Sequence, residues 1–432
     1  MKLVGTRDPR DVATFLEATA GATPAHGGLF TFDAWPRFDD VDELLALPWR
    51  ERCIAILGRL VGDELDRDQR TRIVDESLDF PVPVVALADG TYALELFHGP
   101  TLAFKDFGAR FLAAVLARIA PRAGAPTRTI LTATSGDTGA AVAHAFWRRA
   151  GVRVVVLYPR GRVSPLQERQ IASLGENVTT FAVDGSFDDC QALVKQCFAD
   201  AALVAELGLT SANSINIARL IAQVLYEFEA VADLRRRGVR QPLVVSVPSG
   251  NFGNLCAGLM AERFGLPVRA FVAATNANAT VPEYLAGGAY RPRASVATMS
   301  NAMDVGDPSN WERIEAMFGR DRASMLERIR SGSVDDDATR DEIRRLAAIG
   351  YVACPHTAVA HRMLRSALRP GEVGVFLATA HAAKFREVLE PVLGRIVDVP
   401  DRLAAVASRP VLSTSISVDR EKLVACMRVT RA

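Results

Sequence analysis

Lysine is rare in this sequence, and its rarity draws attention to the few positions where it occurs. Only five of the 51 basic residues are lysines, and the other 46 are arginines. An amine can lose its proton and attack a carbonyl carbon, whereas a guanidinium group stays protonated. Lys2, Lys195 and Lys422 fit a chain terminus or solvated helix faces. The surroundings of Lys105 and Lys384 are different.

Lys105 stands between Phe104 and Phe107, at the start of a predicted helix that follows a Gly-Pro turn. Apolar surroundings disfavour the charged form of an amine and lower its pKa from about 10.4. An amine that forms an imine with an aldehyde needs such a shift. The competing interpretation is structural: the lysine stem packs on the aromatic rings while the amine reaches water.

Two glycine-bearing loops could each bind an anion. Residues 135–139 (SGDTG) and 248–254 (PSGNFGN) each follow an apolar strand pattern and precede a helical pattern. The first N–H groups of a helix are unpaired, and glycine lets the backbone approach a ligand closely. A single loop of this kind can equally be a tight turn. Two such loops favour two anionic groups held side by side at the carboxyl edge of a sheet.

Thr379 directly follows the apolar run 373–378, at a place where polar side chains of parallel sheets meet ligands. We interpret the nearby His381 as a hydrogen-bonded loop residue rather than a proton carrier. A lysine, two anion cradles and a hydroxyl suit pyridoxal phosphate. This cofactor needs a lysine for its aldehyde, a cradle for its phosphate and a hydrogen-bond partner for its ring nitrogen. The second cradle would then hold a substrate anion.

The elements that position these residues alternate between apolar and amphipathic segments, which is typical of an α/β protein with a parallel, doubly covered sheet. Strands are predicted at 82–87, 91–96, 129–133, 152–158, 178–183, 243–247, 268–273 and 373–378. Helices are predicted at 109–120, 140–149, 188–207, 217–236, 257–264, 340–348 and 357–368.

Composition narrows the classes of function. The net charge of +1 provides no bulk field for nucleic acid or anionic lipid, and no apolar run approaches the length of about 20 residues that a membrane span needs. Six scattered cysteines without CxxC spacing indicate reduced thiols, and no secretory signal is visible. We expect a cytoplasmic enzyme for a small-molecule substrate, without a metal site and without a nucleic-acid or membrane partner.

Several longer segments resemble the threonine synthases of the bacterial and fungal type, a family of the tryptophan-synthase-β-like (type II) pyridoxal phosphate enzymes. They are ELFHGPTLAFKDFG, TATSGDTGAAVAHAF, TSANSINIARL, SVPSGNFGN, SNAMDVGDPSNW and LATAHAAKF. The resemblance implies two open sheets covered by helices, with the cofactor in the cleft between domains. It also implies conversion of O-phospho-L-homoserine and water into L-threonine and phosphate. We expect an N-terminal helical extension (1–78), a smaller lysine and substrate domain (79–235) and a larger phosphate-loop domain (236–432).

The resemblance also implies roles for individual residues. Lys105 would form the imine with pyridoxal phosphate, and Thr379 would bond its ring nitrogen. The phosphate of the cofactor would bind at Ser249, Gly250, Asn251, Phe252 and Gly253. The substrate carboxylate would bind at Ser135, Gly136, Asp137 and Thr138.

The substrate's own phosphate needs a third anion site. Arg160 follows a predicted strand, and Ser214 and Asn216 precede a helix that contains Arg219. Our hypothesis is that Arg160 binds this phosphate together with Ser214 and Asn216, because an arginine fork matches phosphate geometry. The alternative is that Arg160 is an ordinary surface charge after a strand.

Three other functions compete with this interpretation. A pyridoxal-dependent dehydratase usually carries a Ser-x-Lys signature, but this chain has Ala103 two residues before Lys105. A catalytically idle relative that binds phosphorylated ligands would not need the amine of Lys105. A nicotinamide oxidoreductase would need a GxGxxG loop followed by an acidic residue, and the sequence lacks that pattern.

Overall fold

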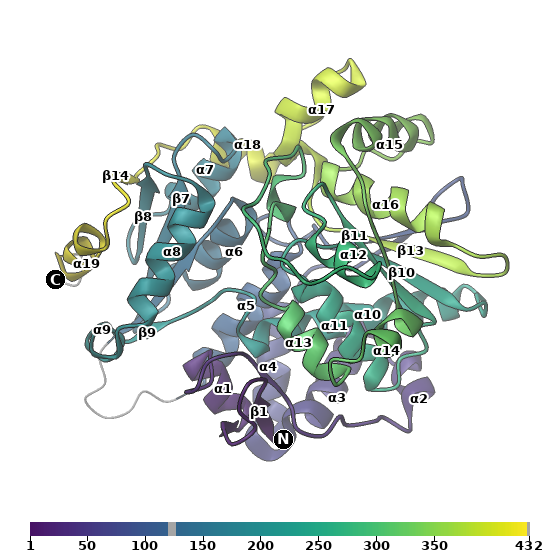
Figure 1. Ribbon diagram of the computed structural model, residues 1–432, viewed down its shortest axis with the longest axis horizontal. Helices are drawn as coiled ribbons and strands as arrows, with labels where there is room; N and C mark the ends of the chain where they lie inside the picture. The colour runs from purple at the N-terminus through teal and green to yellow at the C-terminus, as the bar shows by residue number, and fades with distance from the viewer. Residues whose placement is uncertain (120–126, 430–432) are drawn as a thin grey trace.

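Two sheets of mostly parallel strands form the body of the protein, and they lie on opposite sides of the view in Figure 1. The computed structural model describes residues 1–119 and 127–429. The larger sheet has six strands in the order β12-β11-β10-β13-β5-β4, with β4 antiparallel to β5 and every other pair parallel. Its strands are β4 (Val84–Ala86), β5 (Tyr92–Glu95), β10 (Leu243–Pro248), β11 (Ala270–Thr275), β12 (Ile329–Ser333) and β13 (Val373–Ala378).

The smaller sheet has five parallel strands in the order β14-β8-β7-β6-β9. Its centre is formed by strands whose side chains are almost all buried on both faces, as expected for a parallel sheet that helices cover. These strands are β6 (Arg128–Ala133), β7 (Val152–Pro159), β8 (Val178–Val183), β9 (Leu209–Thr210) and β14 (Thr414–Ile416).

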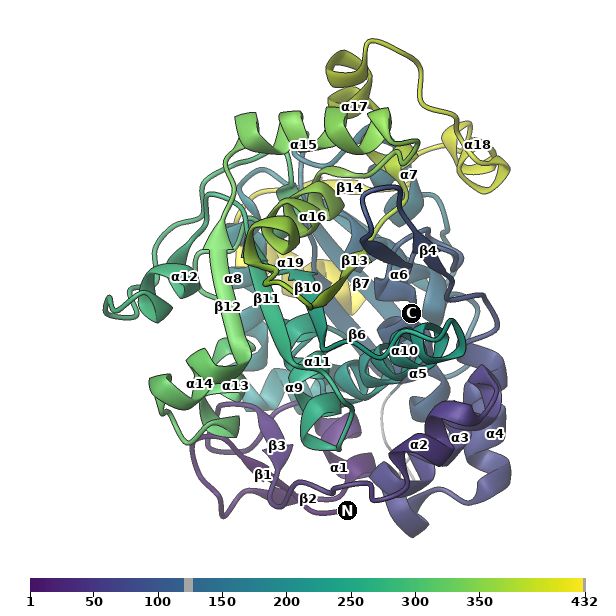
Figure 2. The same cartoon turned by 90° about the vertical axis from the view of Figure 1, so that its right-hand side faces the viewer.

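Helices cover both sheets and fill the space between them. Helix α10 (Ile217–Arg236) is buried along nearly its whole length and packs against α5 (Lys105–Leu116) and α11 (Gly253–Arg263). Helix α16 (Pro355–Ala367) covers the other face of the larger sheet, in front of β10, β11 and β13 in Figure 2. Helices α6 (Asp137–Phe146) and α8 (Phe187–Phe198) pack on the smaller sheet.

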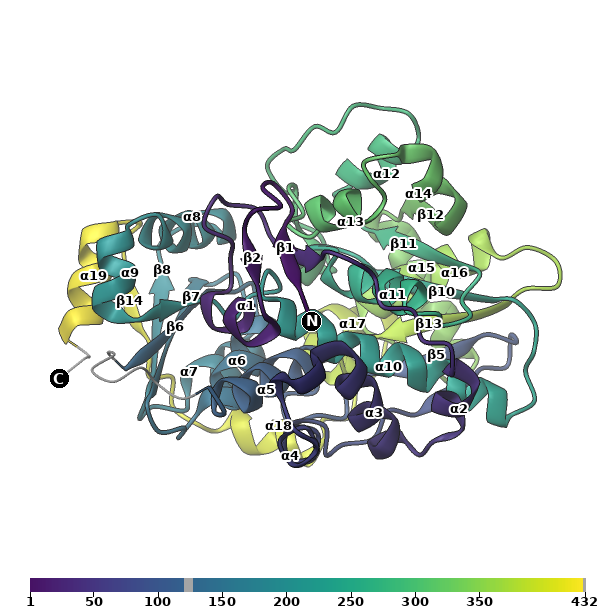
Figure 3. The same cartoon turned by 90° about the horizontal axis from the view of Figure 1, so that it is seen from below.

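The N-terminal extension is not purely helical, contrary to the prediction for residues 1–78. Its first part is a three-stranded antiparallel sheet of β2 (Val12–Ala13), β1 (Leu3–Gly5) and β3 (Phe30–Phe32). These strands are two or three residues long, too short to show the alternation that identifies a strand in a sequence. Figure 3 shows this sheet across the middle of the molecule. The helices of the extension are α1 (Phe15–Gly21), α2 (Val41–Ala46), α3 (Trp49–Val61) and α4 (Arg67–Ser77).

The C-terminal segment returns from the larger sheet to the smaller one (Figure 1). Strand β13 is followed by η3 (Ala382–Phe385), α17 (Arg386–Leu393) and α18 (Asp401–Ala407), after which β14 pairs with β8. The remaining elements are η1 (Gly62–Glu64), α7 (Pro165–Ala172), α9 (Ala201–Leu207), α12 (Thr280–Leu285), η2 (Asn301–Met303), α13 (Trp311–Met317), α14 (Arg322–Arg328), α15 (Asp336–Ala348) and α19 (Arg420–Val429).

We predicted one domain at 79–235 and another at 236–432. The strands of the two sheets cross that boundary in two places. Strands β4 and β5 lie in the larger sheet, and β14 from the C-terminal region completes the smaller one. The sequence pattern shows that a segment is a strand but not which strand it pairs with. Residue 120, the last of the predicted helix 109–120, falls outside the described residues. Within the described chain, no helix has the length and apolar character to cross a membrane.

Candidate active site

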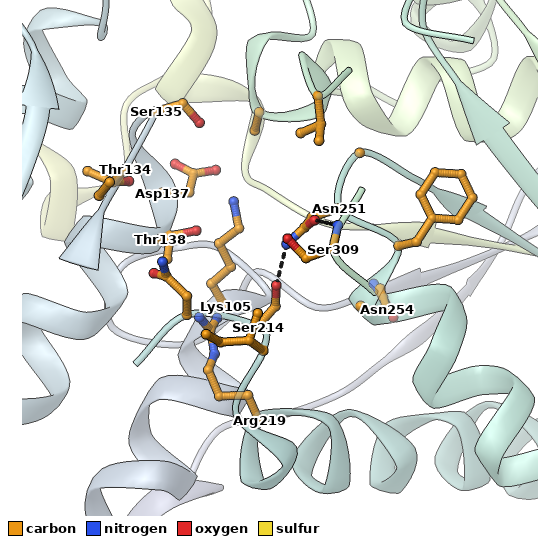
Figure 4. Close-up of a pocket in the computed structure, with 18 of the residues that line it drawn as sticks. Lys105, Thr134, Ser135, Asp137, Thr138, Ser214, Arg219, Asn251, Asn254 and Ser309 are labelled. Atoms are coloured by element: carbon orange, nitrogen blue, oxygen red, sulfur yellow. Dashed lines mark hydrogen bonds between the residues drawn. The ribbon is translucent and has the colours of Figure 1, made fainter. Parts of the chain in front are cut away.

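A cavity of about 340 Å³ opens between the carboxyl ends of the two sheets. The strands β6, β10 and β13 all end at its wall, which is where ligands bind in open α/β sheets. Figure 4 shows side chains from both halves of the molecule converging on it. The sequence-predicted residues that line it are Lys105, Ser135, Asp137, Thr138, Ser214, Ser249, Gly250, Asn251, Phe252, Gly253 and Thr379.

Lys105 is the first residue of α5, and its side chain reaches into the middle of the cavity (Figure 4). Burial lowers the pKa of the amine to about 8, and the nearby positive charges of Arg219 and Lys384 act in the same direction, whereas Asp137 raises it. Among the described residues, Nζ has no hydrogen-bond or ion-pair partner; the ring of Phe104 lies 5.7 Å away. The structure therefore presents an amine that no group of the described chain engages and that is neutral more often near pH 7 than an ordinary lysine.

The loop before Lys105 is held in a fixed shape. Asp106 accepts hydrogen bonds from the backbone N–H (2.8 Å) and the hydroxyl (2.7 Å) of Thr101, which closes the turn. Burial raises the pKa of Asp106 to about 6, although these two bonds oppose the shift. The N–H of Phe104 donates to the carbonyl of Thr379 (2.8 Å), so the lysine loop is tied to the end of β13.

Asp137, at the start of α6, forms a buried ion pair with Lys384. The amine of Lys384 lies 2.7 Å from Oδ1 of Asp137 and also donates to the carbonyl of Thr101 (2.8 Å), and Gln167 donates to the same Oδ1 (2.9 Å). Burial alone would raise the pKa of Asp137, but the charges of Lys384 and Lys105 bring it well below its usual range. Asp137 is therefore an anion, so only its backbone N–H group, and not its side chain, could bind a substrate carboxylate at the start of α6.

The loop 249–253 has the close packing that its glycines suggest. A Cβ atom on Gly250 would lie 2.7 Å from the Cα of Met303, so only glycine fits there. Phe252 has φ of +58°, a strained conformation for a large side chain that is typical of functional loops. The loop leads into α11, whose first residues line the cavity, and a helix N-terminus has unpaired N–H groups and a dipole that favour an anion.

Asn251 fixes this loop to the rest of the cavity wall. Its Nδ2 donates to the hydroxyl of Ser214 (2.7 Å), and its Oδ1 accepts from the N–H of Ser309 (2.6 Å), as the dashed lines in Figure 4 show. Asn310 donates to the carbonyl of Asn251 (3.1 Å) and to Ser214 (3.2 Å). Ser214 thus stands beside the 249–253 loop.

The second predicted cradle is the turn before α6. The hydroxyl of Thr134 accepts from the N–H groups of Gly136 (2.9 Å) and Gly139 (2.8 Å), which shapes the turn. Among the described residues, no acceptor is found for the N–H groups of Ser135, Asp137 and Thr138. Gly136 faces Gln167 with φ of +139° and does not line the cavity. This turn offers three backbone donors to an anion.

Thr379 directly follows β13 and lines the cavity. It is nearly buried, and its hydroxyl makes no hydrogen bond with any described residue. A ligand in the cavity could therefore take both the donor and the acceptor capacity of this hydroxyl.

Arg160 and Asn216 do not reach the cavity, and the hypothesis that they bind a phosphate there does not fit the structure. Arg160 is exposed and pairs with Asp184 (2.5 Å) on the surface. Asn216 is the buried N-cap of α10: it accepts from the N–H of Ala218 (3.1 Å) and donates to the carbonyl of Thr19 (2.9 Å). Ser214, the third member of the predicted set, does line the cavity.

Arg219 is a cavity residue to which the sequence analysis gave no role. Its guanidinium is buried below Lys105 (Figure 4), and Nη1 donates to the carbonyl of Ala212 (2.7 Å), while Nε finds no acceptor within residues 1–119 and 127–429. No carboxylate of the described chain pairs with it, and burial lowers its pKa to about 10. A buried cation without a counter-ion is costly, so this position favours an anionic ligand.

Two other parts of the wall were also missed. One is a face of α8 whose residues recur at helical spacing, and the other is the segment after α1. The helical spacing of the α8 residues is visible in the sequence, but the surface that either segment faces depends on the tertiary fold. These residues are Phe187, Gln191, Val194, Lys195 and Phe198 on α8, and Gly21, Ala22 and Thr23 after α1.

The donor set of the cavity fits pyridoxal phosphate. A partly buried amine of lowered pKa suits its aldehyde, and the glycine loop suits its phosphate because it leads into the start of α11 and packs so closely on the backbone of η2 that Gly250 has no room for a side chain. The unpaired hydroxyl of Thr379 suits a ring nitrogen. The residues present therefore provide one group for each reactive part of this cofactor.

Comparison with protein families gives two matches. A family model described as "Pyridoxal-phosphate dependent enzyme" matches residues 85–380. A second one, "Threonine synthase, C-terminal", matches residues 357–426. The first range contains every cavity residue of the lysine loop, the two glycine loops and Thr379.

Individual proteins match over nearly the whole chain. The threonine synthase of Escherichia coli (strain K12) is 50% identical over 421 residues, which cover 97% of each chain, and that of Serratia marcescens is 50% identical over 418 residues, which cover 96% of each. The crystal structure of the E. coli threonine synthase has a TM-score of 0.94 at 49% identity and covers 100% of both chains. A pyridoxal-phosphate-bound threonine synthase from Brucella melitensis has a TM-score of 0.90 at 33% identity and covers 99% of both chains.

Proposed function

This chain belongs to the threonine synthases of the pyridoxal-phosphate-dependent enzyme family, and we propose that Lys105 is the residue on which its reaction depends. The reaction of the family converts O-phospho-L-homoserine and water into L-threonine and phosphate, with pyridoxal phosphate as cofactor. The observation that carries the proposal is the partly buried amine of Lys105 in the cavity, which has a lowered pKa and no hydrogen-bond or ion-pair partner among the described residues.

We assign the cofactor contacts as follows. Lys105 would hold the aldehyde carbon, and the backbone N–H groups of residues 249–253 would hold the phosphate at the start of α11. Thr379 would offer a neutral hydroxyl to the ring nitrogen. When bound, the cofactor supplies an electron sink for negative charge that develops beside the amino-bearing carbon of the substrate.

Different residues of the chain would bind the substrate carboxylate and transfer the substrate's protons. The N–H groups of Ser135, Asp137 and Thr138 would bind the carboxylate, which places Cα beside Nζ of Lys105. With a pKa of about 8, Nζ can accept a proton near neutral pH and return it. It would take a proton from Cα, pass it on, and then take one from Cβ as the phosphate leaves from Cγ. One proton returns to Cγ, the hydroxyl of water adds at Cβ while the other proton of that water goes to the released phosphate, and the return of a proton to Cα completes threonine.

Arg219 is the residue we assign to the substrate's phosphate, in place of Arg160. Its buried guanidinium lines the cavity without a carboxylate partner among the described residues, so a phosphate would supply the missing counter-ion. Ser214 lies near it in the wall and could add its hydroxyl. A cytoplasmic location is also part of the proposal, and it is supported by the six cysteines, all of which are free thiols.

The test is product analysis with purified protein and O-phospho-L-homoserine. The proposal requires phosphate and L-threonine to appear in equal amounts. Lys105→Ala should abolish both, whereas Lys422→Ala, at an exposed position of α19, should leave them unchanged. Release of phosphate with a 2-oxo acid and ammonia instead of threonine would contradict the proposal, because that outcome is elimination of phosphate without addition of water at Cβ.

A further inference from the structure

Lys384 is, with Lys105, one of the two lysines whose surroundings differ from a terminus or a solvated helix face. The proposed reaction assigns no function to it. Its side chain has no exposed surface, although it lies only five residues beyond Thr379. The amine contacts two groups from different parts of the site. They are Oδ1 of Asp137 (2.7 Å), at the head of α6, and the carbonyl of Thr101 (2.8 Å), in the loop that leads to Lys105.

The position of Asp137 poses an electrostatic problem for the site. Its carboxylate is nearly buried and lines the cavity next to the N–H groups that, under the proposed function, bind the substrate carboxylate. Two carboxylates that close would repel each other strongly in a medium of low dielectric. The charge of Asp137 must therefore be cancelled before an anion can bind at the start of α6.

Without another partner, the carboxylate of Asp137 would also stabilise the protonated form of Lys105. Figure 4 shows its carboxylate beside the end of the Lys105 side chain, and its charge favours the protonated form of that amine. Since the structure gives Asp137 an ion pair with Lys384 and none with Lys105, the carboxylate is already engaged elsewhere. Lys384 therefore keeps Asp137 from holding Lys105 as an ammonium ion.

We propose that Lys384 is a positioning residue that cancels the charge of Asp137, which lets the head of α6 accept the substrate carboxylate and leaves the amine of Lys105 free. The inference rests on the proposed function because it takes the start of α6 as the carboxylate site. It also accounts for a lysine in a chain that otherwise uses arginine: the amine reaches Asp137 and Thr101 together in a fully enclosed space.

The test uses two variants of the holoenzyme, because a charge effect and a structural effect predict opposite outcomes for them. Lys384→Met leaves Asp137 as a buried anion with only Gln167 as donor, and should raise KM for O-phospho-L-homoserine by about fivefold or more. Adding Asp137→Asn removes that anion, so the double variant should have a lower KM than Lys384→Met alone. Gln167→Met is the matched control, since it removes a hydrogen bond to the same oxygen without changing the charge.

The outcomes separate the two explanations. A double variant with a KM equal to or above that of Lys384→Met would overturn the proposal, because purely structural damage adds up. The proposal would also be overturned if Gln167→Met raised KM as much as, or more than, Lys384→Met does. If Lys384→Met does not fold, the KM of the double variant is compared with that of the parent chain. A KM within about fivefold of the parent supports the charge effect, and a larger rise overturns the proposal.

Failure of this proposal can be told apart from failure of the proposed function. The parent chain tests the function through threonine formation and Lys105→Ala, without reference to Lys384. The cofactor content of each variant, measured by absorbance after release in alkali, shows whether a change in KM reflects substrate binding or loss of pyridoxal phosphate.

Discussion

Replacing Gly250 by alanine should weaken binding of pyridoxal phosphate more than it weakens the fold. The new Cβ would lie 2.7 Å from Cα of Met303, 3.1 Å from the carbonyl oxygen of Ala302 and 3.2 Å from the carbonyl carbon of Met303. These atoms belong to the backbone of η2 and cannot rotate away as a side chain could. Either η2 or the 249–253 loop must shift.

The expected magnitude follows from the contacts that such a shift would disturb. Overpacking of this kind costs about 1–3 kcal/mol of stability. A hydrogen bond to a charged group contributes about 1.5–3 kcal/mol, so loss of one N–H contact to the cofactor phosphate weakens binding by roughly 10- to 150-fold.

The assay is a titration of cofactor-free protein with pyridoxal phosphate, followed by absorbance or tryptophan fluorescence. Gly58→Ala is the control, because Gly58 lies inside α3 and a Cβ there would meet only the flexible side chain of Arg70, at 3.3 Å. We expect the control to bind the cofactor like the parent chain. A dissociation constant for Gly250→Ala within about twofold of the parent would refute the assignment of this loop to the cofactor phosphate.

Three further predictions concern individual side chains of the cavity. Arg219→Met should raise KM for O-phospho-L-homoserine by roughly tenfold or more, with binding of the phosphate-free product L-threonine unchanged; equal losses for both ligands would argue against a phosphate site. Because burial lowers the pKa of Lys105 to about 8, the neutral fraction of the amine is about one half at pH 8 and rises little beyond about pH 9. The rate of cofactor capture by the ligand-free chain should level off above about pH 9, and a rate that climbs steadily to pH 10 would indicate an ordinary lysine. Thr379→Asp, which places a carboxylate against the ring nitrogen, should lower threonine formation by roughly tenfold and shift the visible absorbance of the holoenzyme. Thr379→Ser should retain both the activity and the absorbance. An aspartate variant with the activity of the parent would exclude the contact between residue 379 and the ring nitrogen.

The buried parallel strands were the easiest elements to predict from the sequence. Strands β8 and β13 have the predicted bounds, because short runs of mainly apolar and β-branched residues are typical of buried strands. Strand β12 was missed, since its sequence IRSGS is largely polar, as expected at the edge of a sheet. The predicted helix at 188–207 is two helices, because Asp200 caps α9 by accepting from the N–H of Leu203.

The candidate site was predictable where its chemistry lies in contiguous residues. The segment around Lys105 and the loop 249–253 carry their shape in local sequence, and the structure places both on one cavity. The choice between Arg160 and Arg219 was not local. Both arginines lie near polar segments after strands, and only tertiary packing places one on the surface and buries the other beneath Lys105.

The same limit applied to Lys384. Its sequence neighbours suggested an unusual environment, but its partners Asp137 and Thr101 are more than 200 residues away along the chain. A buried ion pair between elements of two different sheets leaves no periodic signal in the sequence. Such pairs become visible only when the packing of the sheets is known.

The most direct test of the central claim is to reduce the holoenzyme with borohydride, digest it and identify by mass spectrometry the lysine that carries the pyridoxyl group. The account predicts a single modified peptide, with the label on Lys105. A label on Lys384, which is also buried close to the cavity, or no stable label on any lysine, would contradict the assignment of the reactive amine.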